Sequence, residues 1–100
     1  MRKEYEGGIW IEEGTPALLG VMKDFIEDSG DITFINFKKD AGDTFEKGEV
    51  IASFETAKAV VDLEAPVSGK VVEVNKALAD DPDPLNEDPE NTWIFKIELA

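Results

Sequence analysis

The chain of 100 residues contains neither cysteine nor histidine. Without cysteine it can form no disulfide framework and no thiolate zinc site. The lack of histidine removes the commonest general base and the commonest metal ligand, so Ser-His and Cys-His nucleophile pairs are excluded as well. An enzyme built from this sequence would have to work with carboxylates, hydroxyls and lysines.

Basic residues are also scarce, because ten lysines and arginines stand against 23 aspartates and glutamates, a formal charge of −13. This charge repels nucleic acids and anionic membranes and favours partners with basic docking surfaces, and it also keeps a concentrated protein in solution. No long apolar run is present, so we expect no signal peptide and no membrane span, and a cytoplasmic location. The length predicts one domain over residues 1–100.

Short runs of β-branched and aromatic residues recur along the chain, separated by turns rich in glycine, aspartate and proline. Pro16 and Gly20 divide the run 15–28 into a strand-like piece and a short helix near Lys23–Asp28, which Gly30 would end. Many short strands with little helix predict a mainly β fold, an antiparallel sandwich or barrel with one or two short helices. The predicted strands are 9–11, 32–37, 50–54, 61–65, 70–75 and 93–99.

In the last of these strands, apolar residues alternate with others, which predicts that one face lies in the core. The residues predicted to face the core are Trp93, Phe95, Ile97 and Leu99.

The segment 79–91 is rich in acids and contains three prolines. We predict a solvated loop there, begun by one helical turn at 76–79. Carboxylates suit calcium, but their spacing does not match a D-x-D-x-D-G pattern, so no metal site is expected. Asp62 and Glu64 share a strand face, yet a hydrolase with paired carboxylates needs an enclosed cleft, for which a chain this short has little room.

Lys58 is the most informative residue in the chain. It lies in a turn between two apolar strands, and its neighbours in the turn, Thr56, Ala57 and Ala59, are all small. This pattern presents one long amine on a rigid hairpin with little bulk around it. Most lysines in turns are simply solvated charges, but this layout also suits a lysine that is acylated and then visits several active sites.

The sequence around Lys58 resembles that of the glycine cleavage H proteins, which are lipoyl carriers. The resemblance covers nearly the whole chain. Biotin carriers flank their lysine with methionines, and lipoyl domains of 2-oxo acid dehydrogenases usually place an acid directly before it, whereas Ala57 and Ala59 stand at these positions here. The matching segments are Gly30-Asp31-Ile32, Asp43, Gly48, Glu55-Thr56-Ala57-Lys58-Ala59, the run 65–75, the long loop that follows it, and Trp93–Ile97.

The resemblance implies a lipoyl-domain-like fold and a non-catalytic carrier with lipoate joined to Lys58 through an amide. It implies that Glu55 and Asp62 are acids read by the lipoylating enzyme. It also implies that the arm carries an aminomethyl group and reducing equivalents. The partners would be a lipoylating enzyme, a glycine decarboxylase, an aminomethyltransferase and a dihydrolipoyl dehydrogenase.

Two other functions stay open at this point. H proteins usually open with a His-Glu-Trp sequence. Only its tryptophan has a counterpart in this chain, namely Trp10. Shortened H-like carriers share this departure, and some of them serve redox-linked protein modification or sulfur oxidation. An unmodified acidic adaptor that kept the fold and lost the cofactor is the alternative from another class.

Overall fold

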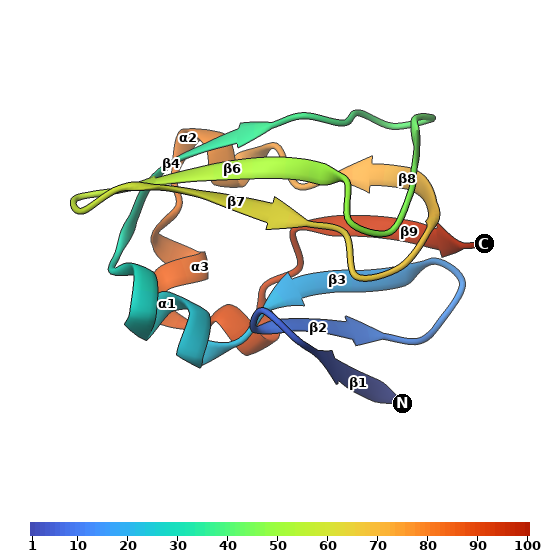
Figure 1. Cartoon of the computed structure of the whole chain (residues 1–100), viewed down its shortest axis with the longest axis horizontal. Coiled ribbons are helices and arrows are strands. Elements are labelled where there is room, and N and C mark those ends of the chain that lie inside the picture. The colour runs from blue at the N-terminus through green and yellow to red at the C-terminus, as the bar shows by residue number, and fades with distance from the viewer.

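The computed structural model describes every residue from Met1 to Ala100. Nine short strands and four short helices follow one another along the chain (Figure 1). They are β1 (Arg2–Tyr5), β2 (Ile9–Glu12), β3 (Ala17–Val21), α1 (Lys23–Ser29), β4 (Ile32–Phe37), β5 (Thr44–Phe45), β6 (Val50–Thr56), β7 (Val60–Glu64), β8 (Gly69–Val74), α2 (Ala77–Asp80), α3 (Asp83–Glu87), the 3-10 helix η1 (Pro89–Asn91) and β9 (Phe95–Leu99).

The strands form two antiparallel sheets. The larger has six strands in the order β1-β2-β3-β9-β8-β5, and the smaller has three in the order β4-β6-β7. Figure 1 shows α1, α2 and α3 at the end of the molecule where the β6–β7 hairpin projects, while both chain termini lie toward the other end. The mainly β fold with short helices predicted from the sequence is confirmed.

The two sheets bury a common apolar core. Phe37 of β4 meets Phe95 of β9 edge to face, with ring centroids 5.6 Å apart. Phe25 of α1 meets Phe54 of β6 in the same way at 5.5 Å. Edge-to-face pairs add to the stabilisation from burial. The first of these pairs therefore holds the larger sheet against the smaller one, and the second holds α1 against the smaller sheet.

The helix near residues 23–28 is confirmed as α1, and Gly30 ends it as predicted. Its backbone N–H donates to Ile26 O at 2.8 Å, and its φ of 84° is a conformation that glycine adopts without strain. No helix of the chain has the length and apolar character that a bilayer crossing needs.

The helical turn predicted at 76–79 is confirmed as α2, but the prediction that the rest of the acidic segment 79–91 is a loop is wrong. The segment folds into the end of α2, then α3 and η1. Leu78 and Leu85 are buried, and they anchor α2 and α3 to the core. Pro84 and Pro89 occupy the first turns of α3 and η1, where the missing N–H has no helical partner in any case, so these prolines favour helix starts.

Two smaller differences concern the ends of the chain. Arg2–Tyr5 was not predicted as a strand because it is polar, yet it pairs with β2 as an edge strand. The last strand begins at Phe95 rather than at 93, and although Phe95 and Ile97 are buried as predicted, Leu99 is 49% exposed. Ile94, predicted to face away, is buried because it precedes the strand and donates its N–H to Leu19 O.

Candidate functional site

The β6–β7 hairpin holds the lysine singled out in the sequence. Glu55 pairs with Val60 in the last register position before the turn, so Ala57, Lys58 and Ala59 form the projecting tip. All three tip residues are exposed. The β6–β7 hairpin that ends in this tip projects from the body of the molecule (Figure 1).

Thr56 fixes the shape of this tip. Its backbone N–H donates to Ala59 O at 2.9 Å, and its hydroxyl donates to the same oxygen at 3.1 Å. The hydroxyl oxygen also accepts the N–H groups of Lys58 and Ala59, both at 3.2 Å. Hydroxyl groups that bond the backbone within a few residues are a regular means of closing turns. The lysine is thus mounted on an ordered turn.

The Lys58 side chain has no ionic partner. Six other cationic side chains form salt bridges, whereas the Lys58 ammonium forms none. Its aliphatic stem passes over Gly30, where a side-chain carbon would lie 3.9 Å from Lys58 Cε. The amine is therefore accessible to an acylating reagent, and no salt bridge has to break first.

The two acids predicted to guide lipoylation lie on the outer face of the smaller sheet. Glu55 is exposed on β6, and Asp62 is exposed on β7 two register pairs farther from the tip, so both lie on the same face. Ser53 donates its hydroxyl to Asp62 Oδ1 at 2.9 Å, which orients that carboxylate. The structure thus brings both acids onto the hairpin that carries Lys58, and their recognition role stays a prediction.

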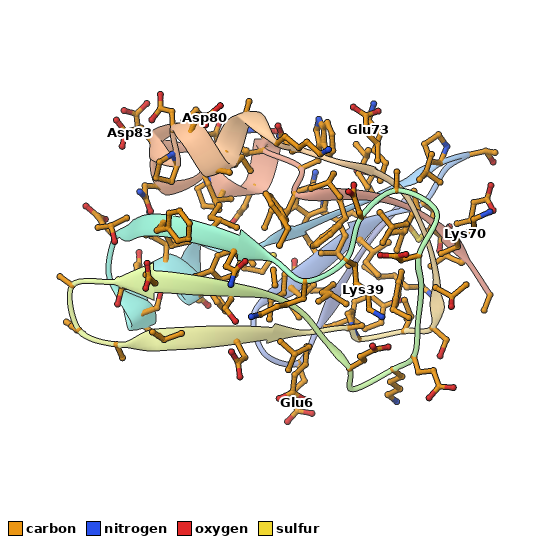
Figure 2. The ribbon with its side chains drawn as sticks, turned by 90° about the horizontal axis from the view of Figure 1, so that it is seen from above. Glu6, Lys39, Lys70, Glu73, Asp80 and Asp83 are labelled. Atoms are coloured by element: carbon orange, nitrogen blue, oxygen red, sulfur yellow. The ribbon has the colours of Figure 1, made fainter.

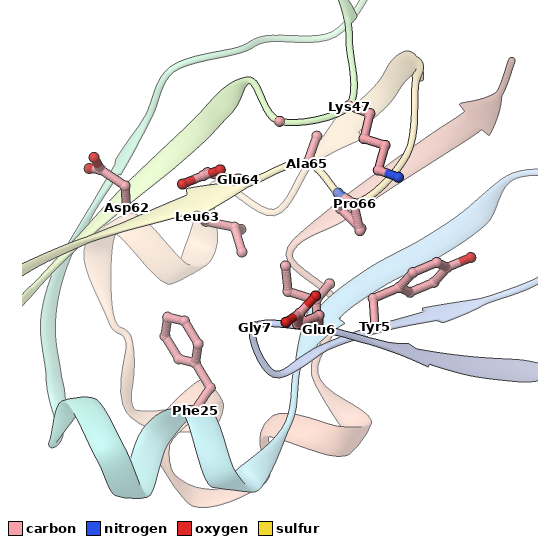
Figure 3. A pocket seen from close by; sticks show the side chains of 12 residues that line it. Tyr5, Glu6, Gly7, Phe25, Lys47, Asp62, Leu63, Glu64, Ala65 and Pro66 are labelled. Atoms are coloured by element: carbon pink, nitrogen blue, oxygen red, sulfur yellow. The ribbon is translucent and has the colours of Figure 1, made fainter.

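A cleft of about 590 Å³ opens between the β1–β2 turn and β7 (Figure 3). Phe25 and Leu63 point into it as apolar walls, and Glu6 lies on its rim. A second, smaller hollow shares Gly7 and Phe25 with it, so the depression follows the open edge of β7 toward the hairpin. Such a lining suits a flexible, mostly apolar group with a polar or cationic end.

Acidic residues gather at the end of the molecule that carries the hairpin. The segment 76–91 contains six acids and one lysine, and the segment 23–31 contains four acids and one lysine. Figure 2 shows Asp80 and Asp83 at this end and Lys70 at the opposite end. The surroundings of the hairpin therefore attract basic surfaces.

The pKa of the Glu49 carboxyl lies below its ordinary value. Glu49, in the loop before β6, accepts a hydrogen bond from Lys39 Nζ at 2.7 Å and another from the Glu46 N–H at 3.0 Å. Both contacts favour the carboxylate and lower its pKa. Glu49 lies far along the hairpin from Lys58 and its backbone joins Ala65, so its role is to close the hairpin base.

Sequence reasoning missed several residues of this site. Ser53 is the single buried polar residue of the molecule. Its position within an otherwise apolar strand is the sequence signal that could have identified it. Thr56 was considered only for its small size. Phe34 was taken as an ordinary strand residue, and Val60 was left outside the predicted strand 61–65, although it begins β7. The exposure of both depends on pairings that the sequence does not show.

Comparisons with known proteins agree with this geometry. The family model described as glycine cleavage H-protein matches residues 1–100. The chain belongs to the glycine cleavage H-protein family. The glycine cleavage system H protein of Dinoroseobacter shibae is 44% identical over 93 residues, covering 91% of this chain and 75% of the relative. That of Acidobacterium capsulatum is 47% identical over 93 residues, covering 91% and 70%.

A solved structure extends this likeness to three dimensions. The crystal structure of a glycine cleavage system H protein from Mycobacterium marinum superposes with a TM-score of 0.89 at 32% identity, covering 99% of this chain and 84% of that one. Family membership assigns to the chain the function predicted from its sequence, that of an H-type lipoyl carrier. Its partners accordingly belong to a multienzyme system.

Proposed function

We propose that Lys58 Nζ carries a lipoyl group in amide linkage and moves an aminomethyl unit and reducing equivalents between the enzymes of glycine cleavage. The observation that carries this proposal is an exposed lysine without an ionic partner, on a hairpin tip whose turn is fixed by Thr56. Of the other lysines without a salt bridge, Lys38 and Lys47 lie in connections between the two sheets and Lys70 lies within β8.

The residues present fit a lipoyl group. Small neighbours, Ala57 and Ala59, leave the amine approachable from several directions. Acylation removes one positive charge, and because Lys58 forms no salt bridge, no acid in the chain loses a bonded partner when this charge disappears. The cleft along β7, with apolar walls at Phe25 and Leu63 and acids on its rim, offers a surface for an arm of this kind.

Attachment of the group is an acyl transfer. The ammonium first loses a proton, and the neutral Nζ then attacks the carbonyl carbon of an activated lipoyl group, such as the mixed anhydride of an acyl nucleotide. A C–N bond forms, the C–O bond to the leaving nucleotide breaks, and the nitrogen releases a second proton to give the amide. No electrons are transferred in this step, and the exposed Nζ is the only atom that this chain supplies to it.

The remaining work of the chain is positional. A lipoyl group held on Lys58 would supply a cyclic disulfide able to accept a carbon unit together with an electron pair. The hairpin holds the base of the arm, which keeps the reactive end at high effective concentration near a docked enzyme. The chain contains no cysteine that could exchange with this disulfide.

The partners follow from the same proposal. They are a lipoylating enzyme that reads Glu55 and Asp62, a glycine decarboxylase, an aminomethyltransferase and a dihydrolipoyl dehydrogenase. The acids around the hairpin support partners with basic docking surfaces. A cytoplasmic location stays a prediction.

The test is an intact mass measurement after incubation with lipoate, ATP and a lipoylating enzyme, with the modified peptide mapped. We expect one lipoyl unit on Lys58 and none in Lys58→Arg, which keeps the charge but offers no amine that can be acylated. Lys47→Arg is the matched control, because Lys47 is also exposed and unpaired, and it should be modified like the wild type. Failure of several lipoylating enzymes to modify the wild type would favour the adaptor.

A further inference from the structure

Two of the large apolar side chains left exposed by the fold lie close to the lysine. Phe34 is 46% exposed and Val60 is 63% exposed, and both belong to the smaller sheet. Val72 and Leu99, at 39% and 49%, are on the larger sheet. Single exposed apolar side chains are common on protein surfaces, whereas apolar side chains grouped on one face form a patch of the kind that marks interaction sites.

The strand register places Phe34 and Val60 on either side of one acid. Phe34 on β4 pairs with Glu55 on β6, and Glu55 pairs with Val60 on β7. An irregularity between Ile32 and Phe34 turns Ile32 inward and leaves Thr33 and Phe34 outside. Phe34, Glu55 and Val60 thus form a row across the outer face, with the acid between two apolar side chains. The row lies in the last β6–β7 register position before the turn that carries Lys58.

The charge of this face has one sign. The three strands of the smaller sheet contain Glu55, Asp62 and Glu64 and no lysine or arginine. A complementary surface therefore has an apolar hollow next to at least one basic side chain. A second copy of this chain is a poor occupant, because the same acids would face each other across the contact.

The partner that binds this face has to contact the hairpin itself. The inner side of the hairpin is already covered, since Phe54 packs on Phe25 and the Lys58 stem passes over Gly30. An enzyme that acylates Nζ must bring this atom into its own active site and so must contact the outer side near the tip. Enzymes that act on the far end of a loaded arm have no such requirement.

We propose that Phe34, Glu55 and Val60 form the docking surface for the lipoylating enzyme, which holds the hairpin through an apolar hollow and a basic side chain. This inference rests on the proposed modification of Lys58 and adds to it the two apolar residues on which recognition depends. Glu55 alone offers only a charge, which many exposed strands also offer. The acid between two apolar side chains distinguishes this hairpin face from other acidic surfaces.

The test is the steady-state kinetics of lipoylation of the full chain by a purified lipoylating enzyme, followed by intact mass. Phe34→Ala should lower kcat/KM about tenfold, as truncation of an aromatic anchor does at interfaces. Val60→Thr, which is nearly isosteric, should lower it about threefold. Both effects should appear in KM with kcat almost unchanged, because docking and not the chemical step is weakened.

Matched variants on the larger sheet serve as controls. Leu99→Ala and Val72→Thr remove comparable exposed apolar surface and should stay within about twofold of the wild type. Phe34→Leu, which restores an apolar side chain, should recover most of the loss. Thermal unfolding of each variant shows whether the fold is kept, and exposed positions should change it little.

The outcomes separate the docking surface from the modification. If the wild type is lipoylated on Lys58 and the Phe34 and Val60 variants react equally well, the docking surface is wrong and the carrier function stands. If the wild type is not lipoylated at all, both fail. If Phe34→Ala converts a dimer into a monomer in sedimentation, a second copy covers this face and the inference is overturned.

Discussion

The two sheets of this protein use their polar and aromatic side chains in opposite ways. In the larger sheet Trp10 is 1% exposed, and its indole N–H is shared between Val21 O at 3.0 Å and Pro89 O at 3.1 Å. Arg2 lies over the same ring at 3.9 Å and donates to Glu90 O. These groups bond within the molecule and tie the first strands to η1.

In the smaller sheet the corresponding groups stay available to other molecules. Lys58 has no ionic partner, and Phe34 and Val60 remain exposed. The first strands of the larger sheet are therefore arranged for stability, and the hairpin end of the smaller sheet is arranged for contact. Substitutions in the larger sheet should change the free energy of unfolding, whereas substitutions near the hairpin should change modification and recognition more than stability.

The largest loss of stability is expected for Trp10→Phe. It leaves the Val21 and Pro89 carbonyls without the indole donor and opens space in the core, at a cost of about 2 kcal/mol. Denaturant unfolding measures this. Trp93→Phe is the control, because Trp93 is only partly buried and should cost less than about 1 kcal/mol. Equal losses in the two variants would contradict the assigned role of Trp10.

A smaller loss is expected for Asn86→Asp. The Asn86 side chain accepts the Ile32 N–H at 2.8 Å and donates to Ile32 O at 2.8 Å, so it closes the open edge of β4 as a further strand would. A carboxylate keeps the acceptor but faces the carbonyl without a proton, which should cost about 1–2 kcal/mol. Denaturant unfolding measures it.

Asn91→Asp is the matched control for this exchange. Asn91 is exposed and bonds only Asp88, so its replacement should cost about 0.5 kcal/mol or less. A larger effect at position 91 than at 86 would show that the edge of β4 does not depend on this side chain.

Thr56→Val should loosen the hairpin tip while leaving the body intact. It removes the hydroxyl that bonds the backbone of Lys58 and Ala59, at a cost of about 1 kcal/mol. Amide hydrogen exchange should rise at residues 57–59, and lipoylation should slow several-fold because the amine is less well positioned. Thr33→Val, which removes a hydroxyl bonded to Glu55 O, is the control and should leave exchange at the tip unchanged. Unchanged exchange in Thr56→Val would remove the basis for an ordered turn.

The smallest effect concerns Glu49 at the base of the hairpin. Lys39→Met removes its strongest partner, so the pKa of the Glu49 carboxyl should rise toward its ordinary value in a carboxyl NMR titration. Because the pKa is lowered in the folded state, the pair stabilises the protein above the unfolded pKa. This contribution is lost as pH falls through the folded pKa. Lys70→Met, at a lysine without an ionic partner, should leave the titration unchanged.

Much of this architecture could be predicted from local patterns. Strand periodicity placed the β6–β7 hairpin and the turn at Lys58, and Gly30 marked the end of α1. These predictions succeeded because the residues concerned interact with near neighbours in the chain. The fold class and the H-protein family followed from the same segments.

What could not be predicted depends on contacts between distant segments. The helices in 79–91 form because Leu78 and Leu85 reach a core made by other strands, whereas acids and prolines alone predict a loop. The polar strand β1 is held by its pairing with β2 and by the Arg2 contacts. The exposure of Phe34 depends on an irregularity in pairing with β6, which no pattern within β4 reveals.

The acids gathered beside the hairpin have a consequence for timing. Charges around a contact accelerate encounter strongly but lengthen the lifetime of a complex much less. At physiological ionic strength the screening length is about 8 Å, so association should slow as salt is raised while dissociation changes little. For a carrier that binds several enzymes in turn, a fast association rate and a short complex lifetime together allow rapid exchange of partners. Such a carrier does not need a permanent assembly.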